Sequence, residues 1–181
     1  MLRNLFKWFL ISFVTVVAVL LIGGLLMNPN FRVTRQVEIN APADRLYALV
    51  SDPREWKRWS VWNQRDPNMQ IRYSGPNSGS GAVWEWQSKS EGDGRMSFTT
   101  AEPGRRLGYD LFFPDFGTTS RGDFRFSPNA SGGTTVIWEM NGDMGKNPMF
   151  RWMAPFADRM IGPDFEAGLN KLKEVAEKPP A

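Results

Sequence analysis

The first pattern along this 181-residue chain is an unbroken apolar run. Residues 8–27 (WFLISFVTVVAVLLIGGLLM) contain no charged side chain. Because an α-helix rises about 1.5 Å per residue, this run is long enough to cross the roughly 30 Å hydrocarbon core of a bilayer. A helix from a soluble core would instead show polar residues every few positions. The pattern therefore predicts a membrane-spanning helix.

A second pattern, alternation of apolar and polar residues, begins at residue 31. The segment 31–40 (FRVTRQVEIN) is rich in β-branched residues and predicts a strand. Further strands are predicted at 69–75, 82–88, 95–102, 106–113, 121–128 and 134–142. The last six are separated by short turns such as GPNSGSG and SEGDG. This arrangement is typical of a meandering antiparallel sheet of about seven strands.

The alternation also separates the two faces of that sheet. One face collects large apolar side chains, and the other carries charged residues such as Glu85, Asp110, Asp123 and Glu139. The apolar set is Trp84, Trp86, Met96, Phe98, Leu107, Tyr109, Leu111, Phe113, Phe124, Phe126, Val136, Trp138 and Met140. We expect the apolar face to pack against helices and the charged face to meet water.

Two short helices are predicted between the first two strands. Pro42 is well placed to open the first, over residues 41–50. The second covers residues 52–59, with Asp52 as N-cap and Pro53 at the first helical position.

The end of the chain shows helical periodicity. Residues 148–160 predict another short helix, and Gly162-Pro163 is expected to break or kink the chain after it. From Pro163 onward, Phe165, Leu169 and Leu172 fall on one helical stripe. The domain is thus predicted to be α+β, with the sheet curled around a long C-terminal helix.

The amino-acid composition excludes several kinds of catalytic and metal-binding site. The chain contains no cysteine and no histidine. Disulfides, thiolate nucleophiles, cysteine-type zinc sites and catalysis by a histidine base are therefore excluded. The net charge is +3, and two of the basic residues, Arg3 and Lys7, precede the apolar run. The remaining domain is nearly neutral, which argues against nucleic-acid binding.

The order of elements, together with particular stretches, resembles the START-like or Bet v1-like helix-grip superfamily. Within it, the chain is similar to the SRPBCC group called polyketide cyclase/dehydrase. The stretches that carry the resemblance are VEINAPADRLYALVSDPREWKRWSVW, YSGPNSGSGAVWEW, GRMSFTTAEPGRRLGYDL, TTVIWEMNGDM and MIGPDFEAGLNKLKE. They extend over about residues 31–175, and a single N-terminal membrane segment is similar to a subset of the group. The resemblance implies an apolar cavity between sheet and last helix that binds a lipid or another hydrophobic small molecule, and in a minority of members cyclisation or dehydration.

The candidate site is the wall or lid of that cavity. The segment REWKRWSVW (54–62) is expected to cover one end of it, with Trp56 and Trp59 on one helix face as a lid. The predicted ligand-binding residues are Trp56, Trp59, Trp62, Trp84, Trp86, Phe98, Tyr109, Leu111, Phe126, Trp138, Met153, Phe156, Met160 and Phe165. No catalytic residue, metal ligand or cofactor is predicted.

Three functions remain open at this point. The first is a membrane-anchored binding module for a lipid or hydrophobic small molecule. The second is an enzyme of the cyclase/dehydratase type, for which Tyr109, or Asp115 and Asp143 at strand ends, are the groups able to reach the cavity. The third is an envelope scaffold for protein interaction, with a filled core.

The predicted organisation is an anchor and linker over residues 1–30, a helix-grip domain over 31–177 and a disordered tail over 178–181. The apolar run exceeds the usual length of a signal-peptide core, and no A-x-A-like cleavage site follows it, so an uncleaved anchor is expected. Arg3 and Lys7 favour a cytoplasmic N-terminus, which places the domain outside the cytoplasm, as in a bacterial periplasm. The alternative is a domain on the cytoplasmic side.

Overall fold

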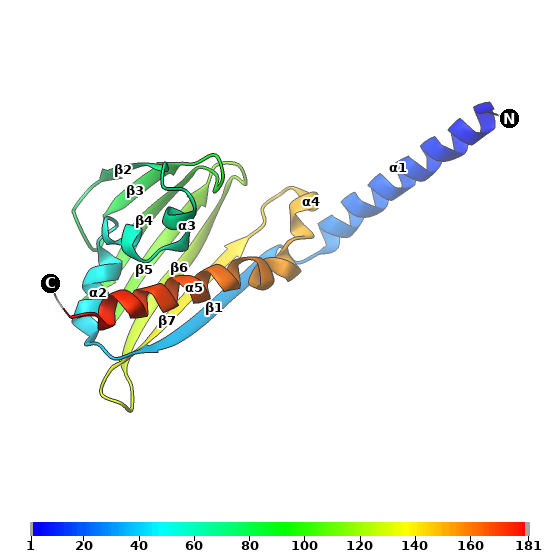
Figure 1. The fold of residues 1–181 in the computed structure, drawn as a ribbon. Helices are drawn as coiled ribbons and strands as arrows, with labels where there is room; N and C mark the ends of the chain where they lie inside the picture. Colours follow the sequence, from blue (N-terminus) through cyan, green and yellow to red (C-terminus); the bar gives the residue numbers. More distant parts are fainter. Residues whose placement is uncertain (1, 180–181) are drawn as a thin grey trace.

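A single seven-stranded antiparallel sheet organises the domain (Figure 1). The structure, a computed structural model, describes residues 2–179, with side chains from residue 3. The strands are β1 (Asn30–Ile39), β2 (Gln70–Ser74), β3 (Val83–Gln87), β4 (Gly94–Glu102), β5 (Arg106–Phe113), β6 (Thr118–Pro128) and β7 (Thr134–Asp143). Their order is β1-β7-β6-β5-β4-β3-β2, so every neighbouring pair except β1–β7 is consecutive along the chain. The predicted α+β helix-grip fold is confirmed.

The helices are distributed between one face of the sheet and one end of it. They are α1 (Leu2–Leu26), α2 (Ala43–Ser51), the 3-10 turn η1 (Glu55–Arg58), α3 (Val61–Arg65), α4 (Pro148–Arg151), the 3-10 turn η2 (Ala154–Phe156) and α5 (Ala157–Glu177). Helix α5 lies across the inner face and packs mainly against β1 (Figure 1). Helices α2 and α3, with η1, cover the rest of that face, while α1 projects away from the domain.

Aromatic stacking joins the sheet to α5. Trp138 of β7 and Phe165 of α5 lie parallel, with ring centroids 3.8 Å apart. Phe124 stacks on the other side of Trp138 at 4.7 Å. All three side chains are almost completely buried, so the predicted apolar face of the sheet forms the core.

The segment after α2 differs from its prediction. Asp52 does not cap a helix; its carboxylate accepts a hydrogen bond from the backbone N–H of Arg54 (2.8 Å) in a turn. The only helical structure in residues 52–59 is the single 3-10 turn η1, and α3 follows it in a segment where no helix was predicted. The reason is local, because short side-chain bonds of Asp favour turns as readily as helix starts.

Of the break or kink predicted at Gly162-Pro163, the break is contradicted, since α5 runs through both residues. Proline removes one intrahelical hydrogen bond, but contacts with β1 hold the helix together across it. Arg35 of β1 lies flat against Gly162, where a Cβ atom would come 2.0 Å from its guanidinium. The same guanidinium binds Asp158 and Glu166, each at 2.7 Å, before and after the proline.

Antiparallel pairing gives the sheet two distinct ends. The start of β1, the end of β7, and the β3–β4 and β5–β6 turns share one end, which we call the anchor end because α1 leaves from it. The β2–β3, β4–β5 and β6–β7 turns share the other, the distal end, where α2 packs beside Phe126. This division places the candidate site.

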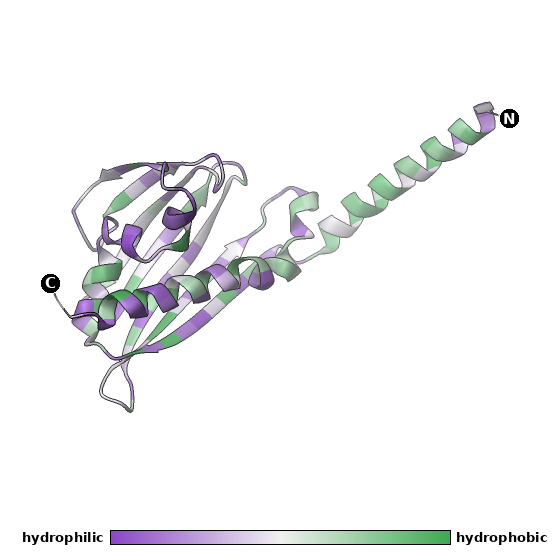
Figure 2. Cartoon of the chain, in the orientation of Figure 1, coloured by the Kyte–Doolittle hydropathy of each residue, from purple (hydrophilic) through white to green (hydrophobic). Residues whose placement is uncertain are grey.

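Helix α1 is long and apolar enough to cross a membrane, and almost none of its length is buried in the domain (Figure 2). An N-terminal signal sequence would share these properties. The low burial separates α1 from the core helices of the domain.

Candidate functional site

The inner face of the sheet is not completely filled. A cavity of about 170 Å³ lies between the sheet, α3 and α5. It is lined by Trp56, Ser60, Trp62, Asn63, Met69, Trp84, Trp86, Glu91, Met96, Tyr109, Leu111, Phe113, Trp138, Met140, Ile161, Asp164 and Phe165. A cavity of roughly 150 Å³ holds benzene, whereas pockets for drug-sized ligands measure about 300–1,000 Å³. The cavity, at the volume it has in this structure, therefore fits one ring or one chain end.

The cavity lies at the anchor end of the sheet. Its wall on β5 is formed by Tyr109, Leu111 and Phe113, in the half of the strand nearer the β5–β6 turn, while Leu107 nearer the distal end is fully buried and off the wall. Trp86 and Met96 border it on both sides of the β3–β4 turn. The lining residues that remain partly exposed include Trp62, Glu91 and Asp164, so the mouth lies between α3, α5 and the β3–β4 turn, at the anchor end of the sheet.

Backbone hydrogen bonds fix one wall. The indole N–H of Trp56 donates to the carbonyl of Val50 at 2.8 Å. Its ring contacts Trp59 and Trp84, with centroids 4.5 and 5.1 Å away. Fixed aromatic rings of this kind offer flat apolar surface at little entropic cost to a ligand.

The inner wall carries one polar pair. The indole N–H of Trp138 donates to the hydroxyl oxygen of Tyr109 at 2.8 Å. Burial raises the pKa of Tyr109 well above its ordinary value, and the bond from Trp138 opposes that rise only partly. The hydroxyl therefore stays protonated and cannot act as a base.

Charged groups gather at the mouth. Trp62 of α3 donates its indole N–H to Asp164 of α5 at 3.1 Å. Arg65, one turn further along α3, makes a two-pronged contact with the same carboxylate and lies 3.6 Å from Glu91 in the β3–β4 turn. These contacts join the three elements that surround the mouth, and they hold α3 over it.

The structure brings eight of the predicted site residues together on the cavity wall: Trp56, Trp62, Trp84, Trp86, Tyr109, Leu111, Trp138 and Phe165. Three others, Trp59, Phe98 and Phe126, are buried in the surrounding core and do not line the cavity. Trp59 is completely buried and donates to the carbonyl of Leu49 at 3.0 Å, so it supports the wall from behind. The two residues of the predicted lid are therefore separated: Trp56 borders the cavity, as Trp62 does, and Trp59 lies behind the wall.

Met153, Phe156 and Met160 lie away from the cavity, contrary to the prediction. Phe156 and Met160 are 53% and 54% exposed, and Met153 packs in a small separate cluster with Met144. The continuity of α5 explains the difference. Residues four apart share a helix face, so Ile161, not Met160, lies beside Phe165 on the cavity.

The sequence reasoning also missed polar and loop residues of the wall, namely Ser60, Asn63, Met69, Glu91, Ile161 and Asp164. Ile161 would have been found by extending the stripe of Phe165 backward across Pro163. Asp164 is a polar residue of α5 beside that stripe, and the other four come from turns and from α3, where no periodicity marks the inward side.

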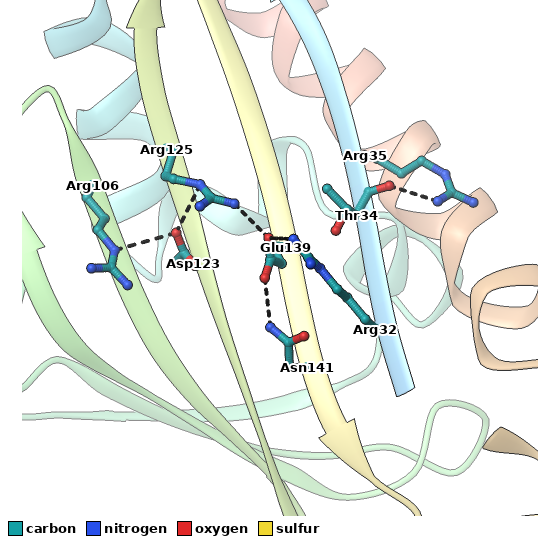
Figure 3. Close-up of polar contacts among 8 residues, drawn as sticks. All are labelled: Arg32, Thr34, Arg35, Arg106, Asp123, Arg125, Glu139 and Asn141. Atoms are coloured by element: carbon teal, nitrogen blue, oxygen red, sulfur yellow. Dashed lines mark hydrogen bonds and ion pairs between the residues drawn. The ribbon is translucent and has the colours of Figure 1, made fainter. Parts of the chain in front are cut away.

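The carboxylates at the strand ends and on the outer face do not reach the cavity. Asp115 and Asp143 are absent from its wall. Glu139 faces outward as predicted, but it is buried rather than solvated, since Arg32 and Arg125 each bind it at 2.7 Å (Figure 3). Hydrogen bonds from Asn141, Arg32 and Arg125 lower its pKa. Glu139 therefore links β1, β7 and β6 on the outer face.

Metal ligation finds no support among the described side chains. Within residues 3–179, no three acidic groups gather into a cluster that could hold an ion. The carboxylates of the mouth are occupied by Arg65.

The comparisons with known proteins agree with the fold. A family model described as "Polyketide cyclase / dehydrase and lipid transport" matches residues 30–177. The chain belongs to this family. The resemblance seen in the sequence is thereby confirmed, and its apolar cavity is in keeping with a family known for binding hydrophobic small molecules.

No curated protein matches the chain. Several solved structures share the fold of this polyketide cyclase/dehydrase family member. The di-domain ARO/CYC protein BexL of the BE-7585A biosynthetic pathway is 21% identical, with a TM-score of 0.59 over 84% of this chain and 52% of BexL. The present chain thus spans about half the length of BexL.

Two further structures align over nearly their whole length. Protein CV1439 from Chromobacterium violaceum is 16% identical, with a TM-score of 0.58 over 83% of this chain and 99% of that one. A truncated norcoclaurine synthase from Thalictrum flavum is 11% identical, with a TM-score of 0.62 over 86% and 98%. At these identities the likeness concerns the fold.

Proposed function

We propose that this chain is a membrane-tethered binding protein for a small hydrophobic molecule or for one end of a lipid. The observation that carries the proposal is the position of the cavity. Its aromatic wall lies at the end of the sheet where the apolar helix α1 ends and β1 starts. A ligand that partitions into a bilayer would reach such a site without crossing much water.

The size of the cavity defines what the closed form accepts. At about 170 Å³ it accommodates one ring or a short length of chain. Longer ligands require α3 to move away from α5, which breaks the contacts of Arg65 and Trp62 with Asp164. We therefore propose that α3 is the element that admits the ligand.

The tether is the second part of the proposal. Helix α1 spans the bilayer, with Arg3 and Lys7 on the cytoplasmic side and the domain outside the cytoplasm. Only residues 27–29 separate α1 from β1, so the domain stays at the bilayer surface.

Intrinsic fluorescence tests ligand binding directly. Five of the eight tryptophans line the cavity, whereas Trp8 and Trp152 belong to α1 and to the segment beside it. We would titrate the full-length chain in nanodiscs with bromobenzene, which has one ring, and with a bromine-labelled fatty acid; in both, the bromine quenches nearby indoles. The expected result is saturable quenching above the linear quenching caused by bromine dissolved in the bilayer.

A variant whose cavity is filled by a larger side chain provides the control for the quenching experiment. Leu111→Phe adds volume at the wall, and Phe112→Leu changes the next side chain, which faces outward. Saturable quenching should disappear in Leu111→Phe and persist in Phe112→Leu. If wild type and both variants all quench linearly, the binding proposal fails and the scaffold with a filled core gains support.

An enzyme of the cyclase/dehydratase type is a second candidate, favoured by the protonated hydroxyl of Tyr109 on the cavity wall. That hydroxyl could hydrogen-bond a substrate carbonyl, and BexL, a structural neighbour, is an ARO/CYC protein. No base accompanies it on the inner wall, since Asp164 and Glu91 lie at the mouth with Arg65. The experiment is turnover of a poly-β-ketone analogue by wild type and Tyr109→Phe; activity that the variant loses would favour the enzyme.

A further inference from the structure

Helix α4 is packed tightly against the C-terminal part of α1. A Cβ atom on Gly24 would lie 2.1 Å from the carbonyl oxygen of Pro148, so only glycine permits the approach. A Cβ atom on Gly23 would lie 2.7 Å from the ring of Trp152. The two glycines therefore form a notch in α1 that receives the start and the end of α4.

Polar contacts determine how far along α1 this packing reaches. The indole N–H of Trp152 donates to the carbonyl of Leu20 at 3.0 Å, and Arg151 donates to the carbonyl of Leu25 at 3.2 Å. Leu20 precedes the end of the apolar run at Met27 by seven residues, which is roughly 10 Å of helix. Helix α4 consequently lies beside the apolar run, not beyond its end.

The segment around α4 also exposes apolar side chains. Outside α1, the large hydrophobic residues exposed in the described chain are Phe112, Phe116, Met149, Trp152, Phe156 and Met160. Phe116, at the β5–β6 turn, contacts Phe150 of α4 with ring centroids 5.3 Å apart. We call Phe116, Met149, Trp152, Phe156 and Met160 the collar, and the hydrophobic colour of α1 continues onto α4 and the start of α5 (Figure 2).

Basic side chains accompany the collar. Lys146 and Arg159 are exposed at its two ends, and Arg151 lies between them. Asp158, the one acidic residue in this stretch, is paired with Arg35 of β1. A mixture of Trp, Phe and Met with Lys and Arg is typical of elements at the boundary between lipid headgroups and acyl chains.

We infer that the collar is a second membrane contact, which enters the headgroup boundary of the leaflet that α1 leaves. The inference rests on the proposed membrane span of α1, because α4 is held level with residues 20–25 of that helix. A single flexible tether would leave the tilt of the domain relative to the bilayer undefined, whereas the collar defines it. In that tilt the anchor end, and with it the mouth of the cavity, faces the bilayer.

Site-directed spin labelling tests this contact in the full-length chain. Because the sequence has no cysteine, each single-cysteine variant carries one label. We would label Met149→Cys, Phe156→Cys and Met160→Cys in nanodiscs of phosphatidylcholine and phosphatidylglycerol. Ser131→Cys, exposed in the β6–β7 turn at the distal end, is the aqueous control, and Val16→Cys in α1 is the lipid control.

Collisions with oxygen, which concentrates in lipid, and with a water-soluble nickel chelate measure the depth of each label. We expect the oxygen-to-nickel ratio at the three collar positions to exceed that at Ser131→Cys several-fold and to approach that at Val16→Cys. Ratios equal to that of Ser131→Cys would overturn the inference. Labels shielded from both reagents would also overturn it, since a second copy or another protein would then cover the collar.

The α1 label separates the two proposals. If Val16→Cys reports lipid while the collar labels report water, the membrane span holds and the collar contact fails. If Val16→Cys reports water, the span itself fails. The exposed positions chosen for labelling have few native contacts to lose, so the variants should fold.

Discussion

The two ends of the sheet carry similar apolar residues but differ in how these residues are packed. At the distal end, Leu107 and Phe126 are buried beside α2 and the neighbouring strands, and neither borders the cavity. At the anchor end, Trp62 and Trp86 border a cavity, and the collar exposes further apolar side chains. The filled distal end contributes packing energy to the fold. This stabilisation allows the anchor end to keep a cavity inside and apolar side chains on its surface.

The segment 54–62 shows the same contrast over a few residues. Trp59 is completely buried, with its indole N–H bonded to the backbone. Trp62, three residues on, borders the cavity and is bonded to Asp164 at the mouth. Identical side chains therefore serve as core in one case and as a candidate binding surface in the other.

The largest expected effect is loss of the core at Trp59. Trp59→Ala should lower the free energy of unfolding by about 3–5 kcal/mol, because a fully buried indole leaves an unfilled cavity. Trp62→Ala, the matched control, should cost about 1–2 kcal/mol, since this ring is only partly buried. Urea unfolding in detergent, followed by far-ultraviolet circular dichroism, measures both. Equal losses would mean that the two rings are packed alike.

A second prediction compares the two ends on one strand. Leu107 and Leu111 lie on the same face of β5, but only Leu111 borders the cavity. Leu107→Phe should lower the free energy of unfolding by about 1–3 kcal/mol through overpacking. Leu111→Phe should change it by less than about 0.5 kcal/mol, because the added ring enters free space. The same denaturation assay applies, and a reversed order would contradict the assignment of a filled and a hollow end.

On the outer face, Glu139 links β1, β6 and β7 through its ion pairs with Arg32 and Arg125. Its folded-state pKa lies below the ordinary value of about 4.3, so the ionised carboxylate stabilises the fold above that pH and this contribution disappears as the pH falls through the lower folded value. At neutral pH, Glu139→Gln should cost about 1–2 kcal/mol. Between roughly pH 5 and pH 3, the variant should lose less stability than wild type. Parallel stability–pH curves for the two proteins would refute this role.

The smallest expected effect on stability is at the mouth. Arg65→Gln removes partly exposed ion pairs with Asp164 and Glu91, so unfolding should change by less than about 1 kcal/mol. The rates of ligand entry and release should both rise, because α3 is then held less firmly over the cavity. Stopped-flow quenching by bromobenzene measures these rates. Arg58→Gln, which removes a surface ion pair with Glu55, is the matched control and should leave them unchanged.

The sheet could be predicted because its signal is local. In β5, the side chains of Leu107, Tyr109 and Leu111 alternate with polar or small residues, and the observed strand begins and ends where predicted. The cavity wall followed in part from the same parity, which placed Trp84, Trp86 and Trp138 correctly on the inner face.

The sequence alone determined an apolar anchor-like helix, a seven-stranded antiparallel sheet with one apolar face, and a C-terminal helix against that face. These features depend on periodicity and on turn residues, which each segment carries by itself. Tertiary structure alone decided that α5 continues through Pro163, because Arg35 on β1 binds both sides of it. It also decided which rings fill space and which border it. That distinction depends on the volume left between elements distant in sequence, and no local pattern records such a volume.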